Sequence, residues 1–514
     1  MISLISLFLF ICLATANGAG YRYGVSDQAF YIPAVLHARD PATFPRDGAL
    51  IEAQARLMVL DEVLAGAMRV TGVPLHVLFA AGYFLSLILI WAALTRIGGF
   101  LYVHRWTTIA LLAAFTLRHQ ITRTSANTFE PYFHPRMLAF GVCALAVAAL
   151  LRRRAWTAIG LVALGGAVHP TTALWFALLI GVALLVSNRA LRPILSTGAA
   201  VALLAAAWAV TAGPLAGSFV VIDADWRQVL ASKTSLFANE WPLAAWVANL
   251  GTAAVWAFAY YDRRRRGLAA PEDTGLAAGG AALVALFLLT LPFVAAGVSF
   301  FVELQISRVF WVVDLMATIY VLSAIERSRS ASPERSRRAI RAAAVVLIVF
   351  SCVRGVYSLY VEHPERSLFS FTLTDSPWHD AMRWIAAQPL DVHVLADPGH
   401  AWKYGTSVRV SAGRDVFQED VKDSALAIYS RDVAMRVLER GRALGDFAAL
   451  TPARARSLAA SYDLDYLVTP AALDLPRAYG NTQFTIYELK PSRSEREGSE
   501  SRMAFFLLNG LRGR

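Results

Sequence analysis

The feature that most constrains this chain is a series of long apolar segments between residues 74 and 361. An α-helix needs about 20 mainly apolar residues to cross the hydrocarbon core of a bilayer. Charged residues make up only 17% of the chain, whereas an ordinary soluble domain has about 25%. The sequence therefore predicts a mostly α fold, a polytopic transmembrane helix bundle. We expect about eleven spans, at residues 2–17, 74–95, 100–119, 136–151, 155–171, 172–188, 193–213, 242–261, 276–302, 307–325 and 340–361.

Clusters of arginine predict how this bundle is oriented. They fall in every second loop, and the positive-inside rule makes those loops cytoplasmic. With an odd number of spans, the N-terminus is cytoplasmic and everything after residue 361 is outside. These loops also account for the net charge of +11, so no nucleic-acid partner is predicted. The loops contain Arg96 and Arg105, Arg152 to Arg154, Arg189 and Arg192, Arg263 to Arg266, and the segment 327–341.

The N-terminal residues 1–17 fit either a cleaved signal peptide or a short first span. No basic n-region precedes the apolar stretch, which favours the span. We therefore assign residues 1–361 to the bundle, including a first outer loop at 18–73. The three cysteines fall inside predicted spans, so neither a disulfide framework nor a thiolate metal site is expected.

The chain changes character at residues 365–492, where we expect a C-terminal extracytoplasmic α/β domain. Four short runs are typical of strands, namely DVHVLAD, SVRVS, DYLVTP and FTIYELK. Helix-like stretches lie between them at 378–388, 421–443 and 452–462. The domain has neither a GxGxxG motif nor a P-loop, so nucleotide binding is not indicated. The polar tail at 493–514 is predicted to be disordered.

Polar residues collect in the loops expected on the outer side. Asp27 follows the first span closely, and a carboxylate held at the membrane surface can serve as a general base towards a hydroxyl group. The alternative is that Asp27 is one of several acids in a long loop. Arg118, His119 and Arg123 follow the third span, and arginine binds phosphate through two parallel hydrogen bonds. The alternative is that they reach lipid headgroups at the interface.

Two histidine–proline pairs lie at the outer ends of predicted spans four and five, which a very short loop joins. His134 and His169 are expected at the same end of antiparallel helices, so their rings should be near neighbours. Two histidines without a third ligand do not predict a metal site, and no cofactor is assigned. Polar contacts or local helix-end structure are the alternatives. Other candidate substrate-binding residues of the outer loops are Glu130, Arg136, Glu303 and Arg308.

Two charges fall inside predicted spans ten and eleven. Asp314 lies six residues beyond Arg308, which is ~9 Å along a helix, and Arg354 lies seven residues before Val361, ~10 Å by the same rise. A lone charge at such a depth is costly. We therefore expect Asp314 and Arg354 to face each other or to share a polar network.

Several of these segments together resemble the GT-C class of membrane glycosyltransferases. The matching stretches are YGVSDQAFYIP, LRHQITRTSANTFEPYFHPRMLAF and HPTTALW, together with the large first outer loop and the outer α/β domain. They look like stretches of a group of bacterial multi-span proteins described as glycosyltransferase-like. Many GT-C enzymes have paired acids in the first loop, whereas this chain has Asp27 followed by Gln28.

The resemblance implies transfer of a sugar from a polyprenyl-phosphate donor on the periplasmic face of a bacterial inner membrane. Asp27 would be the catalytic base, and the arginines would bind the donor phosphate. The implied partners are membrane lipids, a lipid-linked sugar donor and a glycan or lipid acceptor. The bias towards Ala, Arg and Leu is typical of a high-GC bacterium.

Two other classes of function remain as alternatives. A transporter usually shows inverted repeats and ionisable residues near the middle of the membrane, and neither pattern is evident here. A non-catalytic assembly or sensor protein of the cell envelope would use the outer domain to bind a partner.

Overall fold

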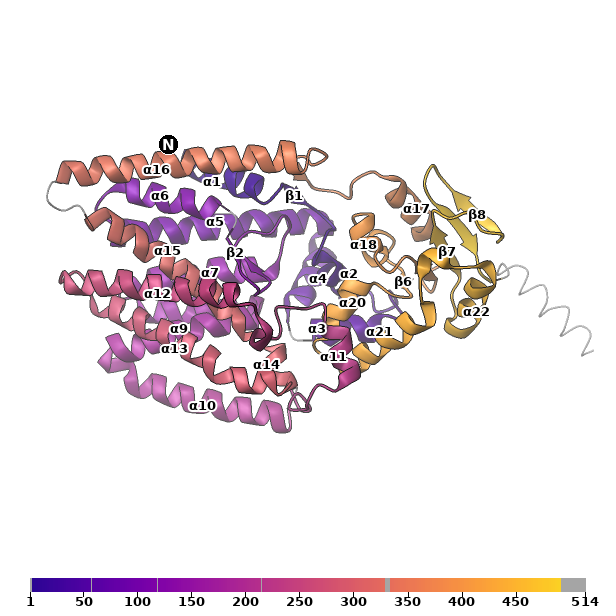
Figure 1. Cartoon of the computed structure of the whole chain (residues 1–514), viewed down its shortest axis with the longest axis horizontal. Coiled ribbons are helices and arrows are strands. Elements are labelled where there is room, and N and C mark those ends of the chain that lie inside the picture. Colours follow the sequence, from indigo (N-terminus) through magenta and orange to yellow (C-terminus); the bar gives the residue numbers. More distant parts are fainter. Residues whose placement is uncertain (1, 57, 118, 214, 329–332, 491–514) are drawn as a thin grey trace, which may run out of the picture. The chain divides into compact units, whose positions relative to one another are not determined.

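The computed structural model describes residues 2–56, 58–117, 119–213, 215–328 and 333–490 (Figure 1). The chain divides into two compact units. The helical unit comprises Met1–Tyr23 and Ala55–Thr372, and the α/β unit comprises Gly24–Gln54 and Leu373–Arg514. The sequence placed the whole first loop, residues 18–73, with the bundle, whereas the structure groups residues 24–54 with the C-terminal part of the chain. The tail predicted to be disordered lies outside the described residues.

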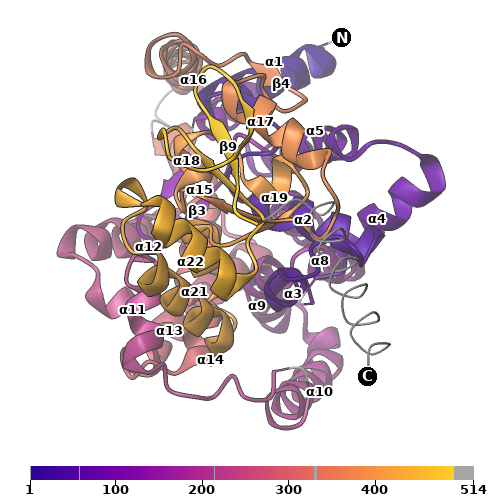
Figure 2. The ribbon, with the colours of Figure 1, turned by 90° about the vertical axis from the view of Figure 1, so that its right-hand side faces the viewer.

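The helical unit has one helix for each predicted span, which confirms the mostly α fold. By length and composition, seven helices in the described part of the chain can cross a membrane, and three further apolar helices are shorter. Helix α10 has no buried residue and lies at the margin of the unit in both views (Figures 1 and 2). The helices are α1 (Ile2–Asn17), α5 (Leu75–Leu101), α6 (Arg105–Thr116), α7 (Pro135–Leu151), α8 (Ala155–Val168), α9 (Pro170–Ser187), α10 (Arg192–Thr211), α12 (Leu243–Arg265), α13 (Pro271–Ala295), α15 (Val309–Ser328) and α16 (Pro333–Tyr357).

The arginine-rich turns meet at one end of this unit, which we call the arginine end. Arg153, in the turn between α7 and α8, lies with its Nε 2.9 Å from a carboxylate oxygen of Glu272 at the start of α13. Arg263, near the end of α12, approaches Asp273 at 3.1 Å. The first of these ion pairs joins turns that are far apart in the sequence, as expected if the turns share one face of a membrane, and the second closes the turn between α12 and α13.

The opposite end of the helical unit contains the longer connections. They include the helices α4 (Leu60–Thr71), α11 (Ala224–Leu230) and α14 (Ser299–Glu303), and the short helices η2 (Ala238–Glu240) and η3 (Ile306–Arg308). A small hairpin joins β2 (Gln120–Ile121) to β3 (Ala126–Asn127). Strand β1 (Tyr21–Arg22) pairs in parallel with β4 (Phe369–Ser370), which ties the end of the first helix to the chain leaving the last one.

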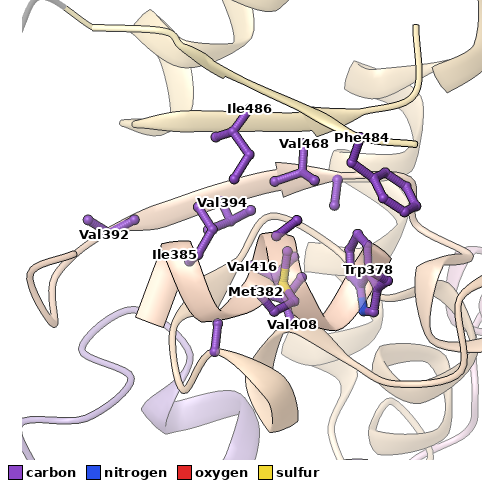
Figure 3. Packing of buried hydrophobic residues seen from close by; sticks show 13 residues of the cluster. Trp378, Met382, Ile385, Val392, Val394, Val408, Val416, Val468, Phe484 and Ile486 are labelled. Carbon is purple, nitrogen blue, oxygen red and sulfur yellow. The ribbon is translucent and has the colours of Figure 1, made fainter. Parts of the chain in front are cut away.

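The α/β unit is built on a five-stranded sheet in the order β6-β5-β7-β9-β8. Strands β6, β5 and β7 are parallel, and β9 and β8 are antiparallel additions. Trp378 and Met382 pack against strand residues such as Val394 and Ile486 in the core (Figure 3). The strands are β5 (His393–Ala396), β6 (Asp415–Val416), β7 (Tyr466–Thr469), β8 (Arg477–Gly480) and β9 (Thr485–Glu488), and the helices are α17 (Pro377–Ala386), α18 (His400–Lys403), α19 (Val408–Ser411), α20 (Asp420–Leu426), α21 (Arg431–Leu444) and α22 (Pro452–Tyr462).

One of the four predicted strands is wrong. The stretch SVRVS forms the short helix α19 instead of a strand. The Ser407 side chain accepts a hydrogen bond from the Arg409 backbone N–H, which is the bond that caps a helix start. The alternation of small and branched residues had suggested a half-buried strand, but the Arg409 side chain is itself buried and forms ion pairs.

The first outer loop contributes two helices, α2 (Gln28–Arg39) and α3 (Gly48–Ala55). Between them, the buried Asp47 carboxylate accepts a hydrogen bond from Arg409 at 2.7 Å and also bonds to Arg436. Asp47 further accepts a hydrogen bond from the backbone N–H of Val416 in β6. These long-range bonds explain why residues 24–54 fold with the C-terminal part of the chain.

The orientation of the protein in the membrane stays a prediction, and reporter fusions test it. We expect a phosphatase fused after residue 365 to be active, because that point is predicted to lie outside. The same enzyme fused at residue 265, in an arginine-rich turn, should be silent. The reverse pattern would place the arginine end outside and contradict the topology.

Candidate functional site

Two histidines cap helices at the end of the helical unit opposite the arginine end. His134 Nδ1 accepts the backbone N–H of Arg136, 3.1 Å away, and so caps α7. His169 Nδ1 accepts the backbone N–H of Thr172, 3.3 Å away, at the start of α9. In the neutral imidazole one nitrogen accepts and the other donates, so the ring proton of each neutral histidine is on Nε2. The ring centroids are 6.2 Å apart, so the two rings are near neighbours.

A buried ion pair lies beside these histidines. Arg136, in the first turn of α7, donates to Glu130 at 2.6 Å, and each side chain is only 5% exposed. Asn127 donates a second hydrogen bond to Glu130 at 3.1 Å. Desolvating two charges is costly, and such a pair persists only with good geometry and further hydrogen bonds. The guanidinium groups of Arg136 and Arg308 both lie near the His169 ring.

These contacts bring together five of the residues proposed from the sequence. We call Glu130, His134, Arg136, His169 and Arg308 the cation cluster, because four of the five side chains are basic. Side chains that reach towards lipid headgroups keep their charged ends in water. Arg136 and His134 are instead only 4% and 3% exposed.

His119 has a different environment from the one expected. Its Nδ1 lies 2.8 Å from a carboxylate oxygen of Asp314, and its Nε2 lies 2.9 Å from the backbone oxygen of Ala114. Both ring nitrogens face acceptors, an arrangement that the doubly protonated ring satisfies. The ring also stacks on Phe115, with centroids 4.9 Å apart. His119 therefore ties the end of α6 to α15.

The predicted pairing of Asp314 with Arg354 is wrong. Arg354 donates to Glu362, 2.8 Å away, near the C-terminal end of the same helical segment. Asp314 is paired with His119 instead. Equal depth in the membrane did not determine which side chains pair. Asp314 lies next to His119 of a nearby loop, and Arg354 lies next to Glu362, which is eight residues further along its own helical segment.

Replacing Asp314 by alanine is expected to destabilise the helical unit. The change leaves the His119 ring without its carboxylate and should cost ~1–3 kcal/mol. Arg354→Ala removes a more exposed pair, whose contribution is only ~0–1 kcal/mol. Thermal unfolding of both variants in detergent measures the difference. Equal losses of stability in the two variants would show that the contact between Asp314 and His119 contributes no more than the exposed pair of Arg354 and Glu362.

The remaining sequence candidates in the helical unit have separate environments. Arg118 lies outside the described residues. Arg123 is exposed and donates to Thr234 at 2.8 Å. Glu303 ends the short helix α14 and is partly buried.

Asp27, the candidate base, belongs to the α/β unit. It precedes α2, and its carboxylate accepts a hydrogen bond from Lys422 Nζ at 2.9 Å. The Lys422 side chain is almost fully buried, and its ammonium lies 5.0 Å from the centroid of the Phe30 ring. Lys422 was not identified from the sequence, because 395 residues separate it from Asp27 and no local pattern marks it.

A second group of charges that the sequence did not indicate lies in the same unit. Arg409 donates to Asp47 at 2.7 Å and to Asp423 at 2.6 Å. Burial alone would raise the pKa of the Asp47 carboxyl, but the nearby Arg409 and Arg436 guanidinium groups outweigh it and hold that pKa well below its usual range. Asp47, Arg409 and Asp423 are all nearly inaccessible to solvent. They connect the first outer loop to the sheet.

Within the described ranges, no group of three or more histidine, cysteine, aspartate or glutamate side chains is arranged to hold a metal ion. The cation cluster has a single carboxylate, which is engaged by Arg136. An arrangement rich in N–H donors suits an anion such as a phosphate.

Comparisons with known proteins give matches among solved structures alone. No family model and no curated protein matches the chain. It is structurally similar to the oligosaccharyltransferase of Archaeoglobus fulgidus tethered with an acceptor peptide, with a TM-score of 0.45 and 12% identity over 91% of this chain and 69% of that chain. The archaeal oligosaccharyltransferase AglB from Archaeoglobus fulgidus, in complex with an inhibitory peptide and a dolichol-phosphate, gives a TM-score of 0.41. Its sequence identity is 13%, again over 91% of this chain and 69% of that chain. The Archaeoglobus fulgidus oligosaccharyltransferase in complex with Zn and sulfate gives a TM-score of 0.36 and 12% identity, over 91% of this chain and 67% of that chain. At these TM-scores we transfer no residue role from those structures to this chain.

Proposed function

We propose that the protein is an integral membrane glycosyltransferase that uses a polyprenyl-phosphate sugar donor. The observation that supports this proposal is the cation cluster at the end of the helical unit opposite the arginine end. The positive-inside rule explains arginines in cytoplasmic loops, so it does not explain buried basic residues at the other end. A membrane-bound substrate with a phosphate group would interact favourably with these side chains.

In the proposed reaction, a hydroxyl oxygen of the acceptor attacks the anomeric carbon of the sugar. The bond between that carbon and the phosphate oxygen breaks, and the polyprenyl phosphate leaves with the electron pair. Negative charge develops on the phosphate as the bond breaks, and preorganised N–H donors stabilise such charge. Arg136 and Arg308, with the Nε2–H groups of His134 and His169, are the proposed donors. Glu130 would keep Arg136 in place, since it accepts a 2.6 Å hydrogen bond from that guanidinium.

The role of Asp27 in this proposal is to accept the proton of the acceptor hydroxyl. General-base catalysis contributes about 10²–10⁴-fold to a rate. The Lys422 ammonium fixes the orientation of the carboxylate through their 2.9 Å hydrogen bond. Lys422 is thus a positioning residue in this account and does not react itself.

An Asp27→Asn variant tests that role in an assay of sugar transfer from a lipid-linked donor. Asparagine has nearly the same shape but cannot accept the proton, so we expect the rate to fall by at least about 10²-fold. Glu52→Gln is the matched control, because Glu52 is an exposed acid of the same outer loop. Activity of Asp27→Asn equal to that of the unmodified protein would remove Asp27 from the mechanism.

A further inference from the structure

A groove between α12 and α13 lies outside the site described above. Its volume is about 720 Å³, within the range of ~300–1,000 Å³ that is typical of ligand pockets. Small side chains form its walls, such as Ala257 on α12 and Ala281 on α13. Trp256 packs over Gly280, where an added Cβ would lie 2.0 Å from the indole ring. Glycine is therefore required at that position for the floor of the groove to form.

The walls of this groove face the surroundings of the bundle. Ala257 and Ala281 are exposed, although both lie on helices that can span a membrane. Leu288, further along α13, also lines the groove and is 44% exposed. In a bilayer, the medium around such residues is hydrocarbon. A concave apolar surface at that depth accommodates either a lipid chain or another helix.

One end of the groove lies at the arginine end of the helical unit. Tyr260 lines the groove there, and its hydroxyl donates to Thr274 at 3.0 Å. Residues three or four apart share a helix face, so Arg264 lies one turn beyond Tyr260 on the face that includes Ala257. Arg265 is rotated about 100° from Arg264 around the axis of α12.

Arg264 also differs from Arg263 and Arg266 in its contacts. Arg263 is bonded to Asp273, and Arg266 is bonded to Asp262. Arg264 is exposed and lies next to the mouth of an apolar groove. Basic residues beside grooves between transmembrane helices on the cytoplasmic side are typical of sites for acidic phospholipids.

We propose that this groove binds an anionic phospholipid of the leaflet at the arginine end. One acyl chain lies along Ala257 and Ala281, and the phosphate contacts Arg264. The positive charge favours a lipid over a helix of a second copy, because a second copy would bring the same arginine to the same level. This site is independent of the proposed glycosyltransferase activity.

Native mass spectrometry of the detergent-purified full chain tests the proposal, with phosphatidylglycerol as the probe and phosphatidylcholine as the neutral comparison. We expect tighter binding of phosphatidylglycerol. Arg264→Ala should weaken it about fivefold, since one arginine near an anionic surface contributes ~1 kcal/mol. Arg265 is also exposed but is rotated about 100° from Arg264 around the helix, so Arg265→Ala should weaken binding less than Arg264→Ala does. Equal losses in the two variants would contradict a defined headgroup site.

A second pair of variants tests the groove itself. The double variant Ala257→Leu with Ala281→Leu fills the groove with side chains that helices accept, and it should remove the bound lipid. Ala205→Leu on α10, a helix with no buried residue, is the matched control and should retain it. Retention of phosphatidylglycerol by the filled variant would overturn the proposal. Conversion of a dimer into a monomer by that variant, without loss of lipid, would assign the groove to a second copy.

Discussion

Replacing Arg409 by methionine is expected to cost the α/β unit ~3–5 kcal/mol of folding free energy. Arg409 is 1% exposed and is bonded to the carboxylates of Asp47 and Asp423. Methionine preserves much of the packing but leaves these two acids buried without their main counter-charge. Domains are stable by only ~5–15 kcal/mol, so the loss is a large fraction of the total.

The result is best read from limited trypsin digestion of the full chain over a range of denaturant concentrations. Arg383→Met is the control, because Arg383 forms an exposed ion pair with Asp380 that contributes ~0–1 kcal/mol. Of the two variants, we expect only Arg409→Met to be cleaved by trypsin in the α/β unit at low denaturant concentrations. If both variants resist digestion equally, the Arg409 ion pairs do not hold residues 24–54 in this unit.

Replacing Arg308 by alanine is expected to weaken binding of a polyprenyl-phosphate donor by about 10- to 150-fold. That factor corresponds to the ~1.5–3 kcal/mol of a hydrogen bond to a charged group. Arg308 is chosen within the cation cluster because it is less deeply buried than Arg136. Arg136→Ala would also leave Glu130 buried without its 2.6 Å partner, which costs folding free energy as well as binding.

Arg123→Ala is the control for this measurement. Arg123 is exposed and bonded to Thr234, and its loss should leave donor affinity nearly unchanged. Equilibrium binding of a fluorescent polyprenyl-phosphate-linked sugar to protein in nanodiscs gives the two donor affinities, and thermal unfolding verifies that both variants are folded. A donor affinity of Arg308→Ala equal to that of Arg123→Ala would count against the cation cluster as the phosphate site.

The sequence predicted the helical architecture well because hydropathy and helix ends are local properties. Each of the eleven predicted spans has a helix, and the arginine-rich turns meet through pairs such as Arg153 with Glu272. The neighbourhood of His134 and His169 followed from their places at the same end of two antiparallel spans joined by a short loop. The helices and their ends depend on residues within one or two turns of each other.

The failures involve partners that are distant in the sequence. Asp27 pairs with Lys422 and Asp47 with Arg409, across 395 and 362 residues. No local pattern connects such residues, so the first loop was assigned to the bundle. Asp314 was given the wrong partner because helix depth constrains position along the membrane and does not determine which neighbour a side chain faces.

The most direct test of the central claim is sugar transfer by the purified full chain in liposomes. The vesicles would contain undecaprenyl-phosphate-linked hexoses or pentoses, and a membrane extract would supply acceptors. The account predicts that donor is consumed, that undecaprenyl phosphate accumulates, and that Arg308→Ala slows both changes at least about tenfold at donor concentrations below saturation, while the protein stays folded. Donor that remains intact with every sugar supplied, or equal consumption by the Arg308→Ala variant, would contradict it.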